Sequence, residues 1–275
     1  MENSSFTNPV AVGDEVDIEI EDVGTGVIQE IFPRRNYLVR RSPKGKNMKH
    51  IVASNIDLAI IMASLKEPRT SPGFIDRCLL TSELYDIPAV LVFNKLDLYS
   101  QNELEQYRKL KDTYNDVGYE VYLISLKEGE QWKQLLPILK DKKSLLTGHS
   151  GVGKSTLINM LFPDLDLYTM EVSEQTGKGM HATTYATMYE LETGGFIIDS
   201  PGLKEFGILD MEASQVGHGF KEMVGPIQKC RFHDCLHLNE PGCGVLKAVK
   251  DGAISESRYT SYVRIVEDIK ENKEW

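Results

Sequence analysis

Cysteine and long apolar runs are both scarce in this chain. Only four of the 275 residues are cysteine, which is too few for the disulfide framework of a small secreted protein. A membrane-spanning helix needs about 20 apolar residues in succession, and one of the longest apolar runs reaches only from Leu58 to Ala63. The segment 1–9 also lacks the basic and apolar regions of a secretory signal. These absences predict a cytoplasmic protein with no membrane partner.

The overall composition is that of an ordinary globular protein, with 41% hydrophobic and 26% charged residues. A length of 275 residues predicts two domains, or one domain with appendages. The net charge of −10 argues against nucleic acid as a partner. Residues 31–50, however, carry seven lysines and arginines and no acidic residue. Such a block either forms a local binding surface for a polyanion or is a solvated loop, and charge alone favours the loop.

Two patterns of apolar spacing divide the chain. Short alternating segments with glycine turns in 10–53 predict part of a small β-barrel. From residue 54 on, strand-like and helical segments alternate, which predicts βαβ units and a mostly parallel sheet. The expected strands are 56–65, 89–93, 120–125, 144–147, 185–192 and 196–199, and the expected helices are 74–85, 101–117, 128–139 and 256–270. The expected domains are 1–53, 54–217 and 218–275.

The strongest motif is Gly148-His-Ser-Gly-Val-Gly-Lys-Ser155, which fits the P-loop pattern G-x-x-x-x-G-K-[ST]. An expected strand precedes it and a helical pattern follows. Glycines let backbone N–H groups converge on phosphate oxygens, and the helix N-terminus adds its dipole. Lys154 is predicted to reach the β- and γ-phosphates and Ser155 to bind Mg²⁺. The predicted phosphate-binding residues are Gly148, Ser150, Gly151, Val152, Gly153, Lys154, Ser155 and Thr156.

A second motif, Asn94-Lys-Leu-Asp97, follows the expected strand 89–93. Asp97 can accept hydrogen bonds from guanine N1–H and the 2-amino group, while Asn94 contacts the ring edge and Lys95 supports the base. Adenine would leave these polar groups unpaired, which costs a factor on the order of 10⁴–10⁵ in analogous sites. The far wall of the base pocket would be formed by Ser125, Leu126 and Lys127.

A third motif, Asp199-Ser-Pro-Gly202, follows the expected strand that ends at Asp199. Asp199 is suited to bind Mg²⁺ through a water molecule, and Gly202 can direct a backbone N–H at the γ-phosphate. The pattern D-x-x-G alone usually marks only a turn. Its occurrence together with a P-loop favours a role in nucleotide binding.

Three of the four cysteines crowd into one segment near the C-terminus, which reads Cys230-x4-Cys235-x-His237-x5-Cys243. Three thiolates and one imidazole form a closed tetrahedral set typical of structural Zn²⁺. Residues 218–275 are too few to bury a large core unaided, so bound zinc could decide whether this unit folds. His233 competes with the histidine of the motif as the imidazole ligand.

Together the P-loop, D-x-x-G, N-K-x-D and S-x-K motifs resemble those of translation-factor-class GTPases. Their order differs, because N-K-x-D and S-x-K precede the P-loop, which indicates a circular permutation. Asn8-Pro-Val-Ala-Val-Gly-Asp14, Asp199-Ser-Pro-Gly-Leu-Lys-Glu-Phe-Gly207 and the cysteine cluster make the chain similar to the RsgA (YjeQ) family of ribosome-assembly GTPases. The resemblance implies an α/β P-loop GTPase domain (circularly permuted), an N-terminal OB-like β-barrel, complete or not, and a C-terminal zinc-binding helical domain.

The resemblance also implies roles within 164–184, the segment that corresponds to switch I of GTPases. Thr183 matches the family's threonine ligand of Mg²⁺, with Thr184 as the alternative, and His181 matches the histidine proposed to position water. Ras-like enzymes use a glutamine after D-x-x-G for that purpose, whereas this chain has Leu203 there. The expected catalytic residues are therefore His181, Lys154 and Thr183.

For the whole chain the resemblance implies hydrolysis of GTP to GDP and phosphate in late assembly of the small ribosomal subunit, which would stimulate the reaction. It implies Mg²⁺ with GTP, structural Zn²⁺ with His237 rather than His233 as a ligand, contacts with rRNA, and a monomer. Three alternatives stay open. They are a GTPase of large-subunit assembly, a nucleotide-dependent RNA-binding switch, and a P-loop ATPase, which the Asn94 and Asp97 pair disfavours.

Overall fold

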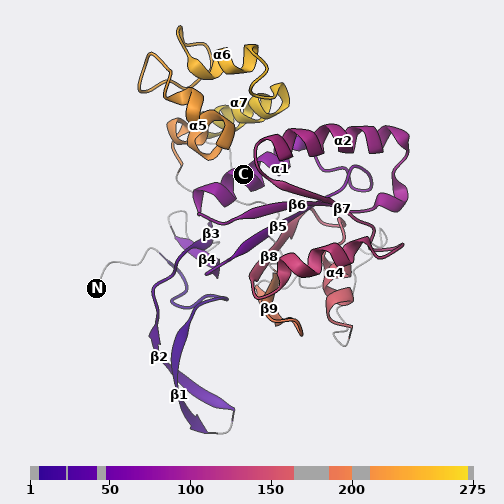
Figure 1. The fold of residues 1–275 in the computed structure, drawn as a ribbon. Helices are drawn as coiled ribbons and strands as arrows, with labels where there is room; N and C mark the ends of the chain where they lie inside the picture. Colours follow the sequence, from indigo (N-terminus) through magenta and orange to yellow (C-terminus); the bar gives the residue numbers. More distant parts are fainter. Residues whose placement is uncertain (1–5, 23, 42–47, 164–185, 200–210, 272–275) are drawn as a thin grey trace, which may run out of the picture.

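A six-stranded sheet forms the centre of the computed structural model, which describes residues 6–22, 24–41, 48–163, 186–199 and 211–271. The strand order is β7-β6-β5-β8-β10-β9 (Figure 1). The strands are β5 (Leu58–Ala63), β6 (Ala89–Phe93), β7 (Glu120–Leu123), β8 (Lys143–Gly148), β9 (Thr187–Glu190) and β10 (Phe196–Asp199). Every neighbouring pair is parallel except the β9–β10 hairpin. The carboxyl ends of β5, β6, β7, β8 and β10 therefore meet along one side of the sheet.

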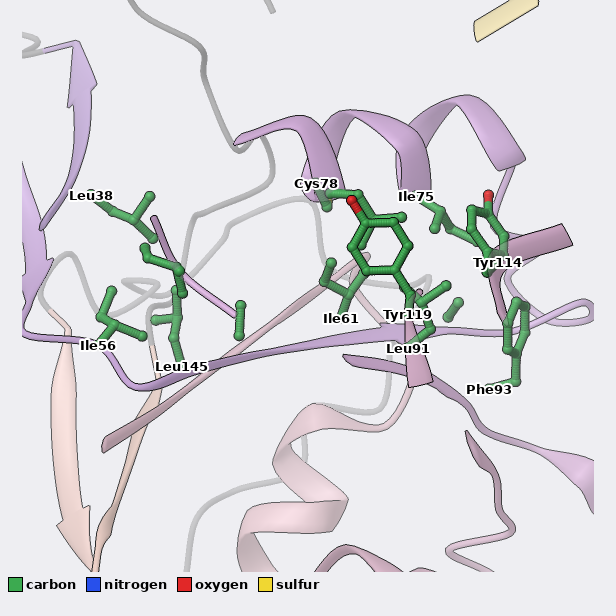
Figure 2. Packing of buried hydrophobic residues seen from close by; sticks show 14 of the residues in the cluster. Leu38, Ile56, Ile61, Ile75, Cys78, Leu91, Phe93, Tyr114, Tyr119 and Leu145 are labelled. Atoms are coloured by element: carbon green, nitrogen blue, oxygen red, sulfur yellow. The ribbon is translucent and has the colours of Figure 1, made fainter. Parts of the chain in front are cut away.

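The central strands are apolar throughout because helices cover both of their faces. All of β5 is buried, and its residues divide between two cores. Ala59, Ile61 and Ala63 pack with α1 (Pro72–Leu84) and α2 (Gln101–Asp116), whereas Leu58, Ile60 and Met62 pack with α3 (Leu136–Leu139) and α4 (Lys154–Leu161). Figure 2 shows Ile75 and Cys78 of α1 pointing toward Ile61 and Leu91 of the sheet. These helices and strands agree with the expected α/β arrangement.

One expected helix is wrong in its form. The pattern over 128–139 predicts a single helix, but the structure has a 3₁₀ helix, η2 (Gln131–Leu135), followed by the single turn of α3. Pro137 explains the break, because it has no amide N–H to continue a helical hydrogen-bond ladder. The expected helix 101–117 does form as α2, which begins with a capping box between Ser100 and Glu103.

The N-terminal part consists of two separate antiparallel ladders in the described residues. One joins β1 (Val16–Asp22) to β2 (Thr25–Ile31) and projects from the body (Figure 1), and the other joins β3 (Tyr37–Arg41) to β4 (Lys49–Ser54). The β3–β4 ladder reaches the main core through Leu38, Val52 and Ala53. The OB-like barrel stays a prediction, since these ladders are not hydrogen-bonded to each other as named strands.

Arg34 and Arg35 of the basic block 31–50 form ion pairs within the chain. Arg34 donates through Nε and Nη2 to the two carboxylate oxygens of buried Asp14, both at 2.7 Å. Arg35 donates through Nη2 to Asp57 at 2.6 Å. Phe32, which lies in the same block, is 44% exposed. Part of the basic block is therefore structural rather than available to a polyanion.

The C-terminal lobe is built from η3 (Ala213–Gly219), α5 (Lys221–Ile227), α6 (Gly244–Lys250) and α7 (Glu256–Lys270). Its core includes Val216, Phe220, Val245 and Tyr262, and Leu80 of α1 belongs to the same core. The lobe lies at the end of the molecule opposite to the β1–β2 ribbon (Figure 1). Within the part of the chain that the structure describes, no helix combines the length and apolarity needed to cross a membrane.

Candidate nucleotide site and metal centre

The P-loop connects β8 to α4 and has the backbone conformation that its glycines permit. Gly148 has φ +142° and Gly153 has φ +108°, a region in which residues with a Cβ are strained. Space is also limited, because a Cβ on Gly148 would lie 2.3 Å from the Met62 carbonyl oxygen. Lys154, at the start of α4, donates through Nζ to the carbonyl oxygens of Gly148 and His149 at 2.7 and 2.9 Å.

Asn94 connects three segments at the carboxyl ends of the strands, and its side chain is almost completely buried. Its Nδ2 donates to the Val152 carbonyl oxygen of the P-loop at 2.8 Å. Its Oδ1 accepts from the backbone N–H of Leu126 at 3.2 Å. We call this arrangement the Asn94 junction. It brings the P-loop and the segment 125–127 against the end of β6, although these segments are far apart in sequence.

The carboxylate of Asp97 is held in place by Ser125, in the segment that follows β7. Buried Ser125 donates through Oγ to Asp97 Oδ1 at 2.7 Å, and the backbone N–H groups of Lys127 and Glu128 donate to the same Oγ at 3.2 and 3.0 Å. Lys95 has a left-handed backbone, and its Nζ donates to the Glu67 carbonyl oxygen. We call the P-loop, 94–97 and 125–127 together the nucleotide edge.

Lys154 and Asp199 place opposite charges near each other at the nucleotide edge. Asp199 ends β10, where it pairs in register with Leu146 of β8. Burial lowers the pKa of the Lys154 ammonium and raises the pKa of the Asp199 carboxyl, and each charge partly offsets the effect on the other. Both groups are thus poorly solvated, so a bound phosphate and a cation would each supply a missing counter-charge.

The four predicted zinc ligands converge in the C-terminal lobe. Their candidate ligand atoms all lie within 4.8 Å of one another, and they come from Cys230, Cys235, His237 and Cys243. A tetrahedral site with Zn–S of about 2.3 Å and Zn–N of about 2.0–2.1 Å has S···S near 3.8 Å and S···N near 3.5 Å. The Cys230 and Cys243 sulfurs are 3.9 Å apart, and His237 Nδ1 lies 3.5 and 3.4 Å from them. The residues therefore fit zinc.

Backbone and tyrosine hydrogen bonds hold the loop that carries the ligands. Glu240 accepts from the N–H groups of Leu236, Leu238 and Asn239 at 2.8–3.0 Å. Tyr259 of α7 donates to the carbonyl oxygen of His237, at 2.8 Å. The rival ligand His233 is exposed and is not part of the cluster. Sequence patterns gave no signal for Glu240 and Tyr259, because their roles depend on tertiary contacts.

Charge also favours a metal at this centre. Burial raises the pKa of the Cys235 thiol to about 12, so an empty centre would keep that proton and only a cation would make the thiolate favourable at neutral pH. Backbone N–H groups point at two of the sulfurs: Gly244 donates to Cys230 Sγ at 3.3 Å and Leu246 to Cys243 Sγ at 3.4 Å. Such donors stabilise negative charge on sulfur.

Three predicted residues, His181, Thr183 and Gly202, lie outside the described residues, as does the alternative Thr184. The others are described. Ser150 and Ser155 are exposed, Thr156 is half-buried, and Val152 is buried. The structure thus brings together the P-loop, the Asn94–Asp97 motif and Ser125–Lys127, with Asp199 close to Lys154.

The P-loop follows β8, the Asn94–Asp97 motif follows β6, and the segment 125–127 follows β7. This order, with the N-K-x-D and S-x-K motifs before the P-loop, defines the class: a P-loop protein with a circularly permuted GTPase fold. Comparison with known proteins agrees. Solved structures similar to this chain include YjeQ from Thermotoga maritima (TM-score 0.78, 34% identity, 94% of this chain and 84% of that one). A second is YloQ, described as a circularly permuted GTPase (TM-score 0.76, 29% identity, 100% of this chain and 84% of that one).

Sequence comparison identifies the family. A family model described as RsgA GTPase matches residues 31–209. The small ribosomal subunit biogenesis GTPase RsgA of Bacteroides fragilis is 45% identical over 267 residues, which cover 97% of this chain and 86% of that protein. The protein of the same name from Christiangramia forsetii is 45% identical over 269 residues, covering 97% and 85%. The chain therefore belongs to the RsgA family of GTPases.

Proposed function

We propose that this protein binds GTP and GDP at the nucleotide edge, hydrolyses GTP, and acts as a monomer in the cytoplasm during assembly of the small ribosomal subunit. The Asn94 junction carries the proposal. One buried amide is bonded to both Val152 and Leu126, so the phosphate-binding and base-binding loops keep a fixed relation. The relatives named small ribosomal subunit biogenesis GTPase align with 97% of this chain and support the assembly role.

The phosphates are assigned to the P-loop. Lys154 has three N–H donors, and two of them bond to the carbonyl oxygens of Gly148 and His149. The third is left for a β- or γ-phosphate oxygen. Backbone N–H groups at the start of α4 add donors and the positive end of the helix dipole. The proposed phosphate-binding residues are Gly148, Ser150, Gly151, Val152, Gly153, Lys154, Ser155 and Thr156.

The guanine base is assigned to Asp97, with Asn94, Lys95 and the 125–127 segment around it. Ser125 bonds to one carboxylate oxygen of Asp97 at 2.7 Å, which leaves the other oxygen to accept from guanine. A carboxylate accepts and does not donate, so it suits the N1–H and 2-amino donors of guanine. Adenine has neither donor on that edge, and this argues against an ATPase.

Magnesium is assigned to the Ser155 hydroxyl and, through water, to Asp199, with Thr183 completing the shell. Hard cations prefer oxygen ligands, and a cation would reverse the raised pKa that burial gives Asp199. We assign His181 to the positioning of water and the Gly202 N–H to the γ-phosphate. Zn²⁺ at the cysteine–histidine centre supplies structure to the C-terminal lobe, since all four ligand positions belong to the protein.

We also propose three units, 1–53, 54–217 and 218–275, with rRNA contacts on the N-terminal unit. Arg34 and Arg35 are committed to Asp14 and Asp57. The basic block 31–50 also carries Arg40, Arg41, Lys44, Lys46 and Lys49, and its concentrated positive charge supports RNA contacts in this unit.

The test is GTP hydrolysis by the purified protein with small ribosomal subunits, with large subunits and with neither, using ATP as the control nucleotide. We expect GTP-specific turnover that rises at least tenfold with small subunits, since partner-supplied groups contribute on the order of 10³–10⁵ in related enzymes. The matched variant Lys154→Ala should show no turnover. Stimulation by large subunits alone would instead support large-subunit assembly.

A second variant separates the enzyme from the RNA-binding switch. His181→Ala should keep GTP binding and lose the stimulated turnover. Normal small-subunit binding by this variant, together with normal function in assembly, would mean that hydrolysis is incidental.

A further inference from the structure

Helix α1 is in contact with the P-loop and with the C-terminal lobe. At its start, the ring of Phe74 stacks on the ring of His149 in the P-loop, with centroids 3.7 Å apart and planes at 28°. Just before the helix, the Cδ of Pro68 lies 3.5 Å from the place that a Cβ on Gly151 would occupy. The outer side of the P-loop therefore rests on residues 68–74.

The residue two positions after Phe74 belongs to a buried ion cluster with the C-terminal lobe. Arg258 of α7 donates through Nη1 to Asp76 Oδ1 at 2.7 Å. The same guanidinium donates through Nε and Nη2 to Glu222 of α5, at 2.7 and 3.1 Å. Tyr114 of α2 donates to the same Asp76 oxygen at 2.9 Å. The side chains of Asp76 and Arg258 are only 1% and 2% exposed.

This cluster fixes the orientation of α1 relative to the lobe. Burial opposes the charge on Arg258, but Asp76 and Glu222 outweigh it and raise the pKa of the guanidinium, which stays charged. Burial raises the pKa of Asp76 as well, and the charge of Arg258 and the hydrogen bonds from Arg258 and Tyr114 oppose that shift. A planar guanidinium bound to two carboxylates tolerates little rotation. The surrounding interface is packed as well, because a Cβ on Gly219 of η3 would lie 2.2 Å from Leu80 of α1.

We infer that Asp76 and Arg258 are positioning residues for the P-loop: they hold the first turn of α1, and through Phe74 they set the affinity of the loop for guanine nucleotide. The inference rests on the proposed function, because it takes 148–155 as the nucleotide loop. Linkage is reciprocal, so bound nucleotide stabilises the contact between α1 and the C-terminal lobe by the same factor. The metal-binding lobe and the nucleotide edge are then energetically coupled.

The first test measures the affinity of the zinc-loaded full chain for GDP carrying a fluorescent label. Asp76→Asn keeps the shape and one acceptor but removes the charge, and Phe74→Leu keeps an apolar side chain but removes the ring stack. Each should weaken binding about fivefold, and the double variant by about the same factor rather than about 25-fold. The control is Asp268→Asn, since Asp268 pairs with Arg77 on the same interface, and it should change affinity less than twofold.

The second test is hydrogen exchange in α7 with and without GDP. In the wild-type chain, GDP should slow hydrogen exchange across 256–266. In Phe74→Leu, saturating GDP should leave the exchange rate of the same residues unchanged. A purely structural role for the cluster would not produce this nucleotide-dependent change. If Asp76→Asn fails to fold, this measurement decides alone.

Two results would overturn the inference while leaving the proposed function intact. The first is a wild-type chain that binds GDP normally but shows no change of hydrogen exchange in α7. The second is a double variant whose loss of GDP affinity equals the product of the losses in Asp76→Asn and Phe74→Leu. A wild-type chain that does not bind labelled GDP at all would instead refute the proposed function, and the inference with it.

Discussion

The nucleotide edge and the metal centre differ in how their polar groups are satisfied. At the nucleotide edge, Asn94 and Asp97 are bonded to other groups of the chain, with distances of 2.7–3.2 Å. At the metal centre, the sulfurs of Cys230 and Cys243 and the imidazole of His237 face one another at 3.4–3.9 Å. In the first arrangement the polar groups are paired with one another, whereas in the second the four ligand atoms are spaced to surround a cation.

This difference bears on how far each site is organised before its ligand binds. Hydrogen bonds within the chain organise the proposed base pocket without a nucleotide, so we expect its cost of ordering on binding to be small. At the metal centre, burial raises the pKa of the Cys235 thiol, so we expect folding of the lobe to be coupled to binding of the metal. Removing each kind of contact should therefore have effects of very different size.

Loss of the metal should have the largest effect, since structural zinc contributes about 10–16 kcal/mol of apparent binding energy. We expect Cys235→Ser to lose zinc and to increase hydrogen exchange strongly in α6 and α7, while β5 and β8 stay protected. The control is Cys78→Ala, because Cys78 is buried in α1 outside the cluster. Full zinc content in Cys235→Ser, measured by metal analysis, would contradict the ligand set.

Asp97→Asn should break the base pocket without affecting the metal. The new amide donor matches the 2-oxo group of xanthine and opposes the 2-amino group of guanine. We expect GTP affinity to fall on the order of 10⁴-fold, as in sites built around buried polar pairs, and xanthosine triphosphate to bind in its place. Calorimetric titration of both nucleotides measures this, with exposed Asp112→Asn as the control. An unchanged preference for GTP would remove Asp97 from the pocket.

The Asp14–Arg34 pair is a third contact satisfied within the chain, and it should respond to acid rather than to chelator. Burial opposes the charge of Asp14, but Arg34, Ser54 and a backbone N–H outweigh it and hold the pKa of Asp14 below its usual value. A lowered pKa stabilises the fold above the unfolded-state value, and the contribution disappears as pH falls through the folded-state value.

We therefore expect stability to decline as pH falls below about 4, the usual value for an aspartate in an unfolded chain. Urea unfolding between pH 3 and pH 6 measures the decline, and Arg34→Gln should flatten it. A pH profile of Arg34→Gln identical to that of the wild type would mean that the pair contributes nothing.

Ser125→Ala should have the smallest effect. It removes one donor to Asp97 but leaves the carboxylate in place, and one such bond contributes about 1 kcal/mol net. GTP affinity should fall about fivefold, with metal content unchanged. Ser100→Ala, which removes the cap of α2 instead, should lower thermal stability and leave GTP affinity unaltered. Equal losses of affinity in both variants would show that Ser125 acts only through general stability.

Local patterns in the sequence predicted much of the fold. Strand β6 and helix α7 have the expected bounds, because apolar runs and helical periodicity are local signals. The prediction of one helix over 128–139 was wrong, because Pro137 interrupts it. Helices α5 and α6 have only seven residues each. Periodicity says little about such short helices.

The candidate sites show the same limit. Motifs predicted the P-loop, the Asn94–Asp97 segment and the cysteine–histidine cluster, because spacing in the chain determines these loops. The Asn94 junction spans 58 residues and the Asp76–Arg258 contact spans 182. No local pattern records such contacts, so the contacts of α1 with the P-loop and with the C-terminal lobe emerged only from the structure.

The most direct test of the central claim is competition of unlabelled GTP and ATP for labelled GDP on the wild-type, zinc-loaded chain. A base pocket organised around Asp97 and Ser125 predicts displacement by GTP at concentrations on the order of 10⁴-fold lower than ATP requires. Displacement by both nucleotides at the same concentration would contradict the account, since the Asn94 junction would then organise a site that does not read guanine.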